Sequence, residues 1–270
     1  LGAAAEEVVG DKGSVTVLAG PQQDPHFVDA KPSFVAKLSK ADLLVHNGMS
    51  LEVGWLPTLI TGSRNSQIQK GSDGHFDASQ YVVRRGVPDV QVDRSMGDVH
   101  AEGNPHFSYD PRQMARVSIA LGKRLAKIDS ANADYYKRRA REFAKDCIRL
   151  AQKWELKFDD LDVSQRNIVV YHKAWIYVTN WLKLDEIIAV EPKPGVPPNP
   201  KHVATVLDKI EKTGAKALLQ MEYYPDSTTK VISQKSDIEL LRLQGHTREG
   251  KSYLDRVDRL AKQIYDALTS

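Results

Sequence analysis

The sequence predicts an α/β fold of two lobes, each built on a mostly parallel sheet, joined by a long rigid helix. Short β-branched runs alternate with segments of helical periodicity, the pattern of parallel strands connected by helices. The runs are continuously apolar rather than alternating, as expected for strands buried on both faces. A charged stretch without proline or glycine, residues 131–160, lies between the two halves and is predicted to be the helix.

Seven runs are predicted to be strands from their length and β-branched content. They are residues 14–19, 43–46, 87–92, 168–171, 186–190, 215–221 and 238–243. Because they alternate with helical segments, we expect them to pair mostly in parallel.

Two helix starts are marked by an N-cap side chain followed by proline at the first helical position. Asp110 precedes Pro111, and a stripe of apolar residues with helical spacing follows it. Asn199 precedes Pro200 in the same way and is also followed by apolar residues at helical spacing. We therefore expect helices to begin at both prolines.

These elements divide the chain into residues 1–130 as an N-terminal lobe, 131–160 as the connecting helix and 161–270 as a C-terminal lobe. A helical connection is stiffer than a Gly/Ser linker and would limit how far the lobes could swing apart. Residues 1–9 read as the later part of a helix, so we expect a preceding segment, such as a secretory signal, to have been removed.

Composition narrows the function classes. The chain has 270 residues, 41% hydrophobic and 27% charged, with a net charge of +3 and no run of basic residues interleaved with aromatics. Nucleic acid is therefore not an expected partner, and no apolar run reaches the roughly 20 residues that span a bilayer. The single cysteine, Cys147, excludes an internal disulfide and a CxxC metal site, so histidines and carboxylates would have to hold any metal.

Three of the eight histidines lie in unusual surroundings. His26 and His106 both occur in the pattern Asx-Pro-His-Phe, in which proline stiffens the loop that carries the histidine. His172 follows the predicted strand 168–171, at the carboxyl end where open α/β sheets place their ligands. Each alone is more simply a hydrogen-bonded structural histidine, but the three together favour a metal site.

The spacing excludes a local metal motif. His26 and His106 are 80 residues apart, His106 and His172 are 66 apart, and no HExxH sequence is present. Only the fold could bring these side chains together, with two of them from the first lobe and one from the second.

Ordered motifs along nearly the whole chain carry a family resemblance. They are residues 23–26 (QDPH), 41–43 (ADL) with 47–48 (NG), 52–56, 97–107 (GDVHAEGNPHF) with 110–111 (DP), 171–175 (YHKAW) and 191–195 (EPKPG). In this order they resemble the cluster A-I substrate-binding proteins, the zinc- and manganese-binding components of ABC importers. The family's initial strand, which precedes the first helix, is missing here.

The resemblance implies a metal ion bound in the cleft between the lobes by His26, His106 and His172. Many members add an aspartate after the last strand, but residues 243–250 contain none. His246 is our first candidate for a fourth ligand, Glu222 is the second, and a water or anion is the third.

Other residues near these motifs have weaker assignments. Asp24 and Glu191 are candidates to orient the histidine rings, although helix capping or hydration explains each nearly as well. Residues 62–79 occupy the place of the family's histidine-rich loop but contain only His75, so a metal-gathering loop is not expected. The remaining histidines, His46, His100 and His202, are expected to be structural or exposed, with His100 the strongest exception because of its closeness in sequence to His106.

Three imidazoles favour Zn²⁺ as the transported ligand, with Mn²⁺ as the alternative that would need more oxygen ligands. The resemblance implies a monomeric, exported protein, periplasmic or on the cell surface, that delivers the ion to the membrane permease of an ABC importer. Because only unprotonated imidazoles bind, we expect affinity to fall below about pH 6.5. The rival interpretations are a zinc hydrolase using the same three histidines and an adhesive surface protein in which zinc is incidental.

Overall fold

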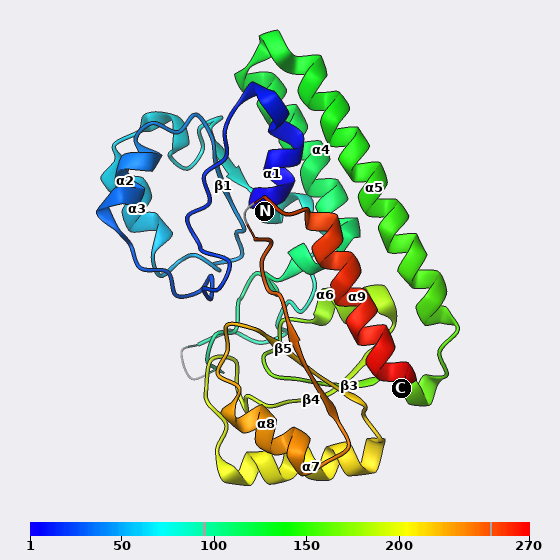
Figure 1. Cartoon of the computed structure of the whole chain (residues 1–270). Helices are drawn as coiled ribbons and strands as arrows, with labels where there is room; N and C mark the ends of the chain where they lie inside the picture. The colour runs from blue at the N-terminus through cyan, green and yellow to red at the C-terminus, as the bar shows by residue number, and fades with distance from the viewer. Residues whose placement is uncertain (94–95, 249) are drawn as a thin grey trace.

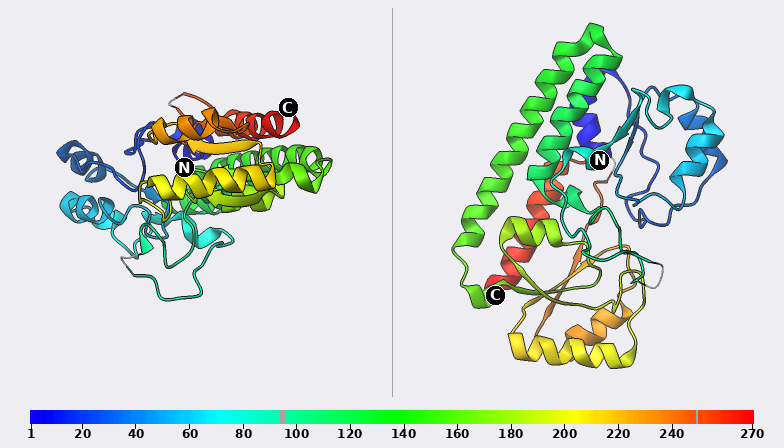
Figure 2. Two further views of the ribbon diagram at one scale, coloured as in Figure 1. Left: turned by 90° about the horizontal axis from the view of Figure 1, so that it is seen from below. Right: turned by 180° about the vertical axis from the view of Figure 1, so that it is seen from behind.

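The computed structural model describes residues 1–93, 96–248 and 250–270 and confirms the α/β fold. Figure 1 shows two lobes, one carrying α2 and α3 and the other carrying β3 to β6, with the long helix α5 (Ala133–Asp159) on the far side of the molecule from α2 and α3. The views in Figure 2 show the same arrangement from below and from behind. All strand pairs of the two sheets are parallel in the described part of the chain.

The first lobe has a small sheet of two strands, β1 (Leu44–His46) and β2 (His75–Asp77). Helices α2 (Pro32–Leu38) and α3 (Leu56–Ser63) pack beside it around a small apolar core that includes Trp55. Loops, rather than helices or strands, connect this lobe to the metal centre described below.

The second lobe has four strands in the order β4-β3-β5-β6. Their bounds are Asn167–Val170 for β3, Asp185–Ala189 for β4, Ala217–Met221 for β5 and Glu239–Leu243 for β6. Val169 and Leu218 face α7 (Pro200–Thr213) and α8 (Ser227–Gln234), whereas the neighbouring residues of the same strands face the main core. The sheet is therefore buried on both faces, which explains its continuous apolar runs.

Four more helices complete the main core. Helices α4 (Pro111–Ile128) and α5 form a hairpin, α1 (Gly2–Val9) packs on both, and α6 (Ile176–Leu182) and α9 (Tyr253–Thr269) pack on α5. The expected caps are present, since Asp110 accepts the backbone N–H of Arg112 and Asn199 accepts that of His202. The connecting helix thus shares its core with elements of both lobes.

Gly122 explains how closely α4 approaches α5. A Cβ atom at this position would lie 2.5 Å from the Cβ of Ala140.

Short 3₁₀ helices lie at Gly10–Lys12, Ser66–Ile68, Ala78–Tyr81, Phe107–Tyr109, Ser130–Asn132 and Val163–Arg166. Over residues 1–93, 96–248 and 250–270, no helix has the length and apolar character needed to cross a membrane.

Two strand predictions are wrong, and one strand was missed. Residues 14–19 and 87–92 are not strands, and β2 was not predicted. Val17, Val87 and Val90 are each more than half exposed, and Pro88 has no N–H to donate to a ladder. β2 is too short for its pattern to be recognised, because it has three residues of which only Phe76 is a buried apolar one.

Candidate metal centre

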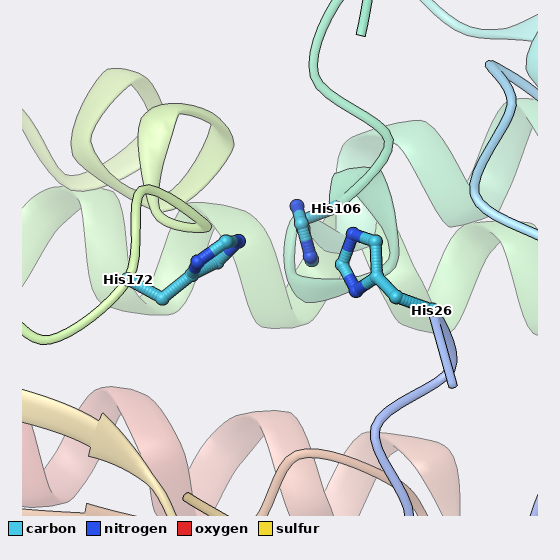
Figure 3. Close-up of side chains that lie close together, drawn as sticks. All are labelled: His26, His106 and His172. Atoms are coloured by element: carbon cyan, nitrogen blue, oxygen red, sulfur yellow. The ribbon is translucent and has the colours of Figure 1, made fainter. Parts of the chain in front are cut away.

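The structure brings His26, His106 and His172 together. One ligand atom from each ring lies within 4.8 Å of the others, and the ring centroids are 5.4 to 5.7 Å apart. Figure 3 shows the three rings converging from separate segments of the chain. They are 9%, 5% and 4% exposed, respectively, so the centre is largely shielded from bulk water.

The two Asx-Pro-His segments fold in the same way. Asp24 Oδ1 accepts both the backbone N–H of His26 at 3.0 Å and its ring Nδ1 at 2.7 Å. Asn104 Oδ1 accepts the same two groups of His106 at 3.0 and 2.9 Å. Because a backbone N–H can only donate, it identifies the oxygen of the Asn104 amide. In the neutral rings each Nδ1 therefore carries the proton, and each Nε2 presents a lone pair.

His172 is held by a different residue to the same effect. It lies two residues after the end of β3, and its Nδ1 donates to Glu191 Oε2 at 2.7 Å, in a contact where both side chains are buried. The same carboxylate oxygen accepts the backbone N–H of Gly195 at 2.9 Å. A carboxylate or amide that holds Nδ1 is the usual support of a metal-binding imidazole. Asp24 and Glu191 therefore lie where ring-orienting residues are expected, whereas the equivalent place of Asn104 was missed from the sequence.

The surroundings of His106 keep its ring unprotonated. The Nε2 atom of His106 is buried and has no hydrogen-bond partner in the described structure. Burial, and then the neighbouring His26 and His172, hold the pKa of His106 well below its usual value. A buried polar atom without a partner is costly unless something satisfies it. A cation held between the three Nε2 atoms would do so, and the donor set suits a zinc-like ion.

Residues of both lobes meet at this centre. The amide nitrogen of Asn104 donates to the backbone oxygen of Lys173 at 2.6 Å, which links the His106 loop to the residue after His172. Asp98 N–H donates to the oxygen of Pro194 at 2.9 Å. A cavity of about 410 Å³ opens beside His106 and His172 and is lined from both sides. The site therefore lies in a cleft between the lobes.

A buried loop of the first lobe supports the His106 segment. Asn47 donates its side-chain amide to the oxygen of Pro105 at 2.6 Å. Glu52 accepts the backbone N–H groups of Asn47 and Gly48 at 2.7 and 3.3 Å, and burial raises the pKa of Glu52 to about 7. This explains in part why residues 47–48 and 52 belong to the motif pattern noted in the sequence.

His100 lies much closer to the centre than its sequence neighbourhood indicated. Its Nε2 atom is 3.2 Å from the Nε2 of His26, and the ring centroids are 5.3 Å apart. Burial, followed by the charge of His26, lowers the pKa of His100 to about 4. It is not part of the mutually close group of three, but it lies against one member of that group.

The residues predicted as fourth ligands, His246 and Glu222, have other surroundings than the three histidines. His246 stacks on Tyr223 with ring centroids 5.6 Å apart, and its buried Nε2 has no partner in the described structure. Its ligand atoms are not among the group formed by the three histidines. Glu222 has one oxygen 3.3 Å from Arg248 and the other buried without a partner among the described residues. Of the other histidines, His202 bonds the backbone oxygen of Ala189 at 2.9 Å.

Known proteins share both the sequence pattern and the fold. The family model described as zinc-uptake complex component A, periplasmic (ZnuA), matches residues 1–267. The manganese ABC transporter substrate-binding lipoprotein PsaA of Streptococcus mitis is 21% identical over 97% of this chain and 84% of its own length. A putative metal-binding protein of Treponema pallidum is 24% identical over 96% of this chain and 82% of its own length.

Solved structures give the same result for the fold. A crystal structure of ZnuA superposes with a TM-score of 0.81 at 21% identity, covering 98% of this chain and 94% of the other. The laminin-binding adhesin Lmb of Streptococcus agalactiae gives 0.79 at 20% identity, covering 99% and 96%. FpvC of Pseudomonas aeruginosa, in complex with Mn²⁺, gives 0.77 at 20% identity, covering 99% and 94%.

The match along nearly the entire chain confirms the resemblance inferred from the motifs and the prediction of a transport component rather than an enzyme. The zinc-hydrolase interpretation is not retained. The chain belongs to the ZnuA family of periplasmic zinc-uptake components.

Proposed function

We propose that this protein captures Zn²⁺ at His26, His106 and His172 and delivers it to the membrane permease of an ABC importer. The observation that supports this most strongly is the shared arrangement of the three rings. Each Nδ1 is bonded to a side-chain oxygen, so that three unprotonated Nε2 atoms are available to one ion. Such pre-orientation reduces the cost of ordering the ligands when the ion binds.

The donor set favours zinc over manganese. Zinc accepts a tetrahedral shell rich in imidazole nitrogen, whereas manganese prefers carboxylate and water oxygens. The relatives PsaA and FpvC carry manganese in their names or titles, so Mn²⁺ stays the alternative for this chain. The carboxylates of Asp24 and Glu191 hold ring nitrogens of the histidines and support the nitrogen shell from outside.

The fourth position of the shell has several candidates. His246, Glu222 and a water or anion were predicted from the sequence, and these assignments stay predictions. The 3.2 Å separation of the His100 and His26 Nε2 atoms adds His100 to them and favours it. We propose that His100 closes the shell from the loop that precedes His106.

The division into lobes and the location outside the cytoplasm are proposed with the support of the family and its relatives. We propose that residues 1–130 and 161–270 act as two lobes held by the helix of residues 131–160, which limits the motion available for release. The α4–α5 hairpin supports this division, since α5 packs on elements of both halves. The relatives named as lipoproteins or periplasmic components support an exported protein outside the cytoplasm. That it acts as a monomer stays a prediction from the sequence.

Elemental analysis of protein purified without an affinity tag tests the proposal. We expect tightly bound zinc at one equivalent, lost in His26→Ala, His106→Ala and His172→Ala but kept in the control His202→Ala. A cell that lacks this binding protein but keeps the permease can be complemented with each variant. Restored zinc uptake with the wild type, and not with the three variants, would link the site to uptake. Retention of the zinc in all three variants, or the loss of zinc without any loss of uptake, would contradict the proposal.

A further inference from the structure

A second pair of histidines meets in the first lobe. His46 ends β1 and His75 begins β2, and the parallel register places Leu44 opposite His75 and His46 opposite Asp77. The Nε2 atoms of the two rings are 3.0 Å apart, and the ring centroids are 4.8 Å apart. These residues are outside the group formed by the three histidines of the cleft.

The proton positions in this pair follow from its partners. The Nδ1 of His75 is 2.9 Å from the backbone oxygen of Ile68. Because a carbonyl oxygen can only accept, this Nδ1 carries the proton, and the Nε2 of neutral His75 is a free acceptor. The Nδ1 of His46 faces Glu52 Oε2 at 4.0 Å. A proton on that nitrogen would face a carboxylate oxygen and leave the Nε2 of His46 free as well.

The separation of the two Nε2 atoms suits a bound ion. Two Zn–N bonds of 2.0–2.1 Å at a tetrahedral angle place their nitrogens roughly 3.3 Å apart. The observed 3.0 Å is close to that value. Without an ion, one Nε2 must instead carry a proton and donate it to the other, so the two interpretations differ in the tautomer of His46.

The surroundings supply negative charge as well as burial. The side chain of His46 is 15% exposed and that of Glu52 is 12% exposed. Burial is the main cause that lowers the pKa of His46 to about 4; His75 and Lys70 lower it too, while Asp77 raises it. The ring is therefore neutral at pH 7. Asp77 acts on the ring of His46, and beside the ring lies Glu52, whose pKa of about 7 leaves it partly ionised in the metal-free protein and available to ionise fully beside a cation; Lys70 is the positive side chain that acts on the ring.

We propose that His46 and His75 form a second site for a zinc-like divalent cation, separate from the cleft and weaker than it. Two imidazoles supply the protein ligands, Ile68 and Glu52 orient them, and water completes the shell. The site is weaker because it has fewer protein ligands and one of its orienting contacts is long. Borderline metals such as Zn²⁺, Ni²⁺ and Cu²⁺ fit imidazole donors, whereas Mg²⁺ and Ca²⁺ do not.

Zinc titration of the full chain after removal of bound metal tests this inference. We expect a tight equivalent followed by a weaker one for the wild type. His46→Ala and His75→Gln should lose only the weaker equivalent, and His106→Ala should lose only the tight one. His202→Ala is the matched control and should keep both. The glutamine at position 75 can still donate to Ile68, which protects the fold of the lobe.

The two assignments fail in distinguishable ways. Loss of the tight equivalent only in the cleft variants supports the proposed function whatever the pair does. A wild type that binds no weaker equivalent, or one whose weaker equivalent persists in both His46→Ala and His75→Gln, would overturn the second site. Imidazole ¹⁵N spectra give an independent readout, since metal binding shifts the Nε2 signals of His46 and His75. An unchanged Nε2–H signal from His46 in excess zinc would show a histidine–histidine hydrogen bond only.

Discussion

The histidine triad of the cleft and the His46–His75 pair differ in how their rings are held. The triad comes from three loops remote in sequence, and each Nδ1 is bonded to a side-chain oxygen at 2.7 to 2.9 Å. The pair comes from adjacent strands of one lobe, with one Nδ1 on a backbone carbonyl and the other 4.0 Å from a carboxylate. Ring orientation is therefore tighter in the triad.

The two clusters also differ in which movement of the protein would change their geometry. Because its histidines come from both lobes, the triad is sensitive to the position of one lobe against the other, through contacts such as Asn104 with Lys173. The pair lies within the first lobe and depends on the register of β1 and β2 and on contacts of that lobe. Delivery of a cation requires release as well as capture, and a site divided between lobes can be opened by a small relative movement.

The largest expected effect is the loss of a direct ligand of the triad. His172→Ala should weaken zinc binding by more than about 100-fold, because even substitution of an orienting residue costs about 10- to 100-fold. Competition against a chromophoric chelator measures this loss, with His202→Ala as the control. An affinity within about 10-fold of the wild type would remove His172 from the ligand set.

A smaller loss is expected when an orienting residue is replaced. Asn104→Ala removes the oxygen that holds His106 and the donor to Lys173, and it should cost about 10- to 100-fold in zinc affinity. Asn104→Asp keeps the oxygen and loses only the donor, as in the Asp24–His26 segment, so it should cost less. Equal losses in the two variants would show that the contact between the lobes matters more than the orientation of His106.

The buried histidines and the carboxyl of Glu52 change the free energy of unfolding with pH in opposite directions. In the folded, metal-free protein the pKa values of His46, His100 and His246 are lowered to about 4, whereas in the unfolded chain histidine titrates near 6.5. Between these values the unfolded state binds more protons, so the free energy of unfolding should fall as pH drops from about 6.5 to about 4. Glu52, with its pKa raised to about 7, acts in the opposite direction and offsets part of this loss.

Urea unfolding of metal-free protein at a series of pH values measures this dependence. His100→Gln should reduce the slope between pH 4 and 6.5, because it removes a group that the folded state keeps neutral. A wild type that is as stable at pH 4.5 as at pH 6.5 would contradict the lowered pKa values.

The smallest effect on zinc affinity is expected at the fourth position of the cleft. His100→Ala should weaken binding less than Asn104→Ala, because three direct ligands remain in place. His246→Ala should have a smaller effect still, since its ring stacks on Tyr223, whereas the Nε2 of His100 lies 3.2 Å from that of His26. Titrations with the two variants side by side decide between them, and a larger loss in His246→Ala would restore the prediction made from the sequence.

Much of the framework follows from local signals. The Asp110-Pro111 and Asn199-Pro200 starts carry their own capping chemistry, and the buried sheet shows as continuous apolar runs. The exceptions have local causes. Residues 87–92 resemble a strand in composition, but Pro88 and the exposed valines have no neighbouring strand to pair with.

The site was harder to predict where its contacts depend on the path of the folded chain. The Asx-Pro-His segments identified His26 and His106 as stiffly held side chains, and its place at the carboxyl end of the predicted strand 168–171 identified His172. The approach of His100 to His26 and the meeting of His46 with His75 depend on loop paths and strand register. No spacing in the sequence encodes these contacts, because the partners are 74 and 29 residues apart.

X-ray absorption at the zinc edge tests the central claim most directly. For protein loaded with one equivalent of zinc, we expect a shell dominated by nitrogen at about 2.0–2.1 Å, with the outer-shell scattering of at least three imidazoles. The same spectrum of His106→Ala should lose one imidazole or show no tightly bound zinc. A shell dominated by oxygen, or a spectrum unchanged by His106→Ala, would contradict the assignment of the cleft histidines as the metal centre.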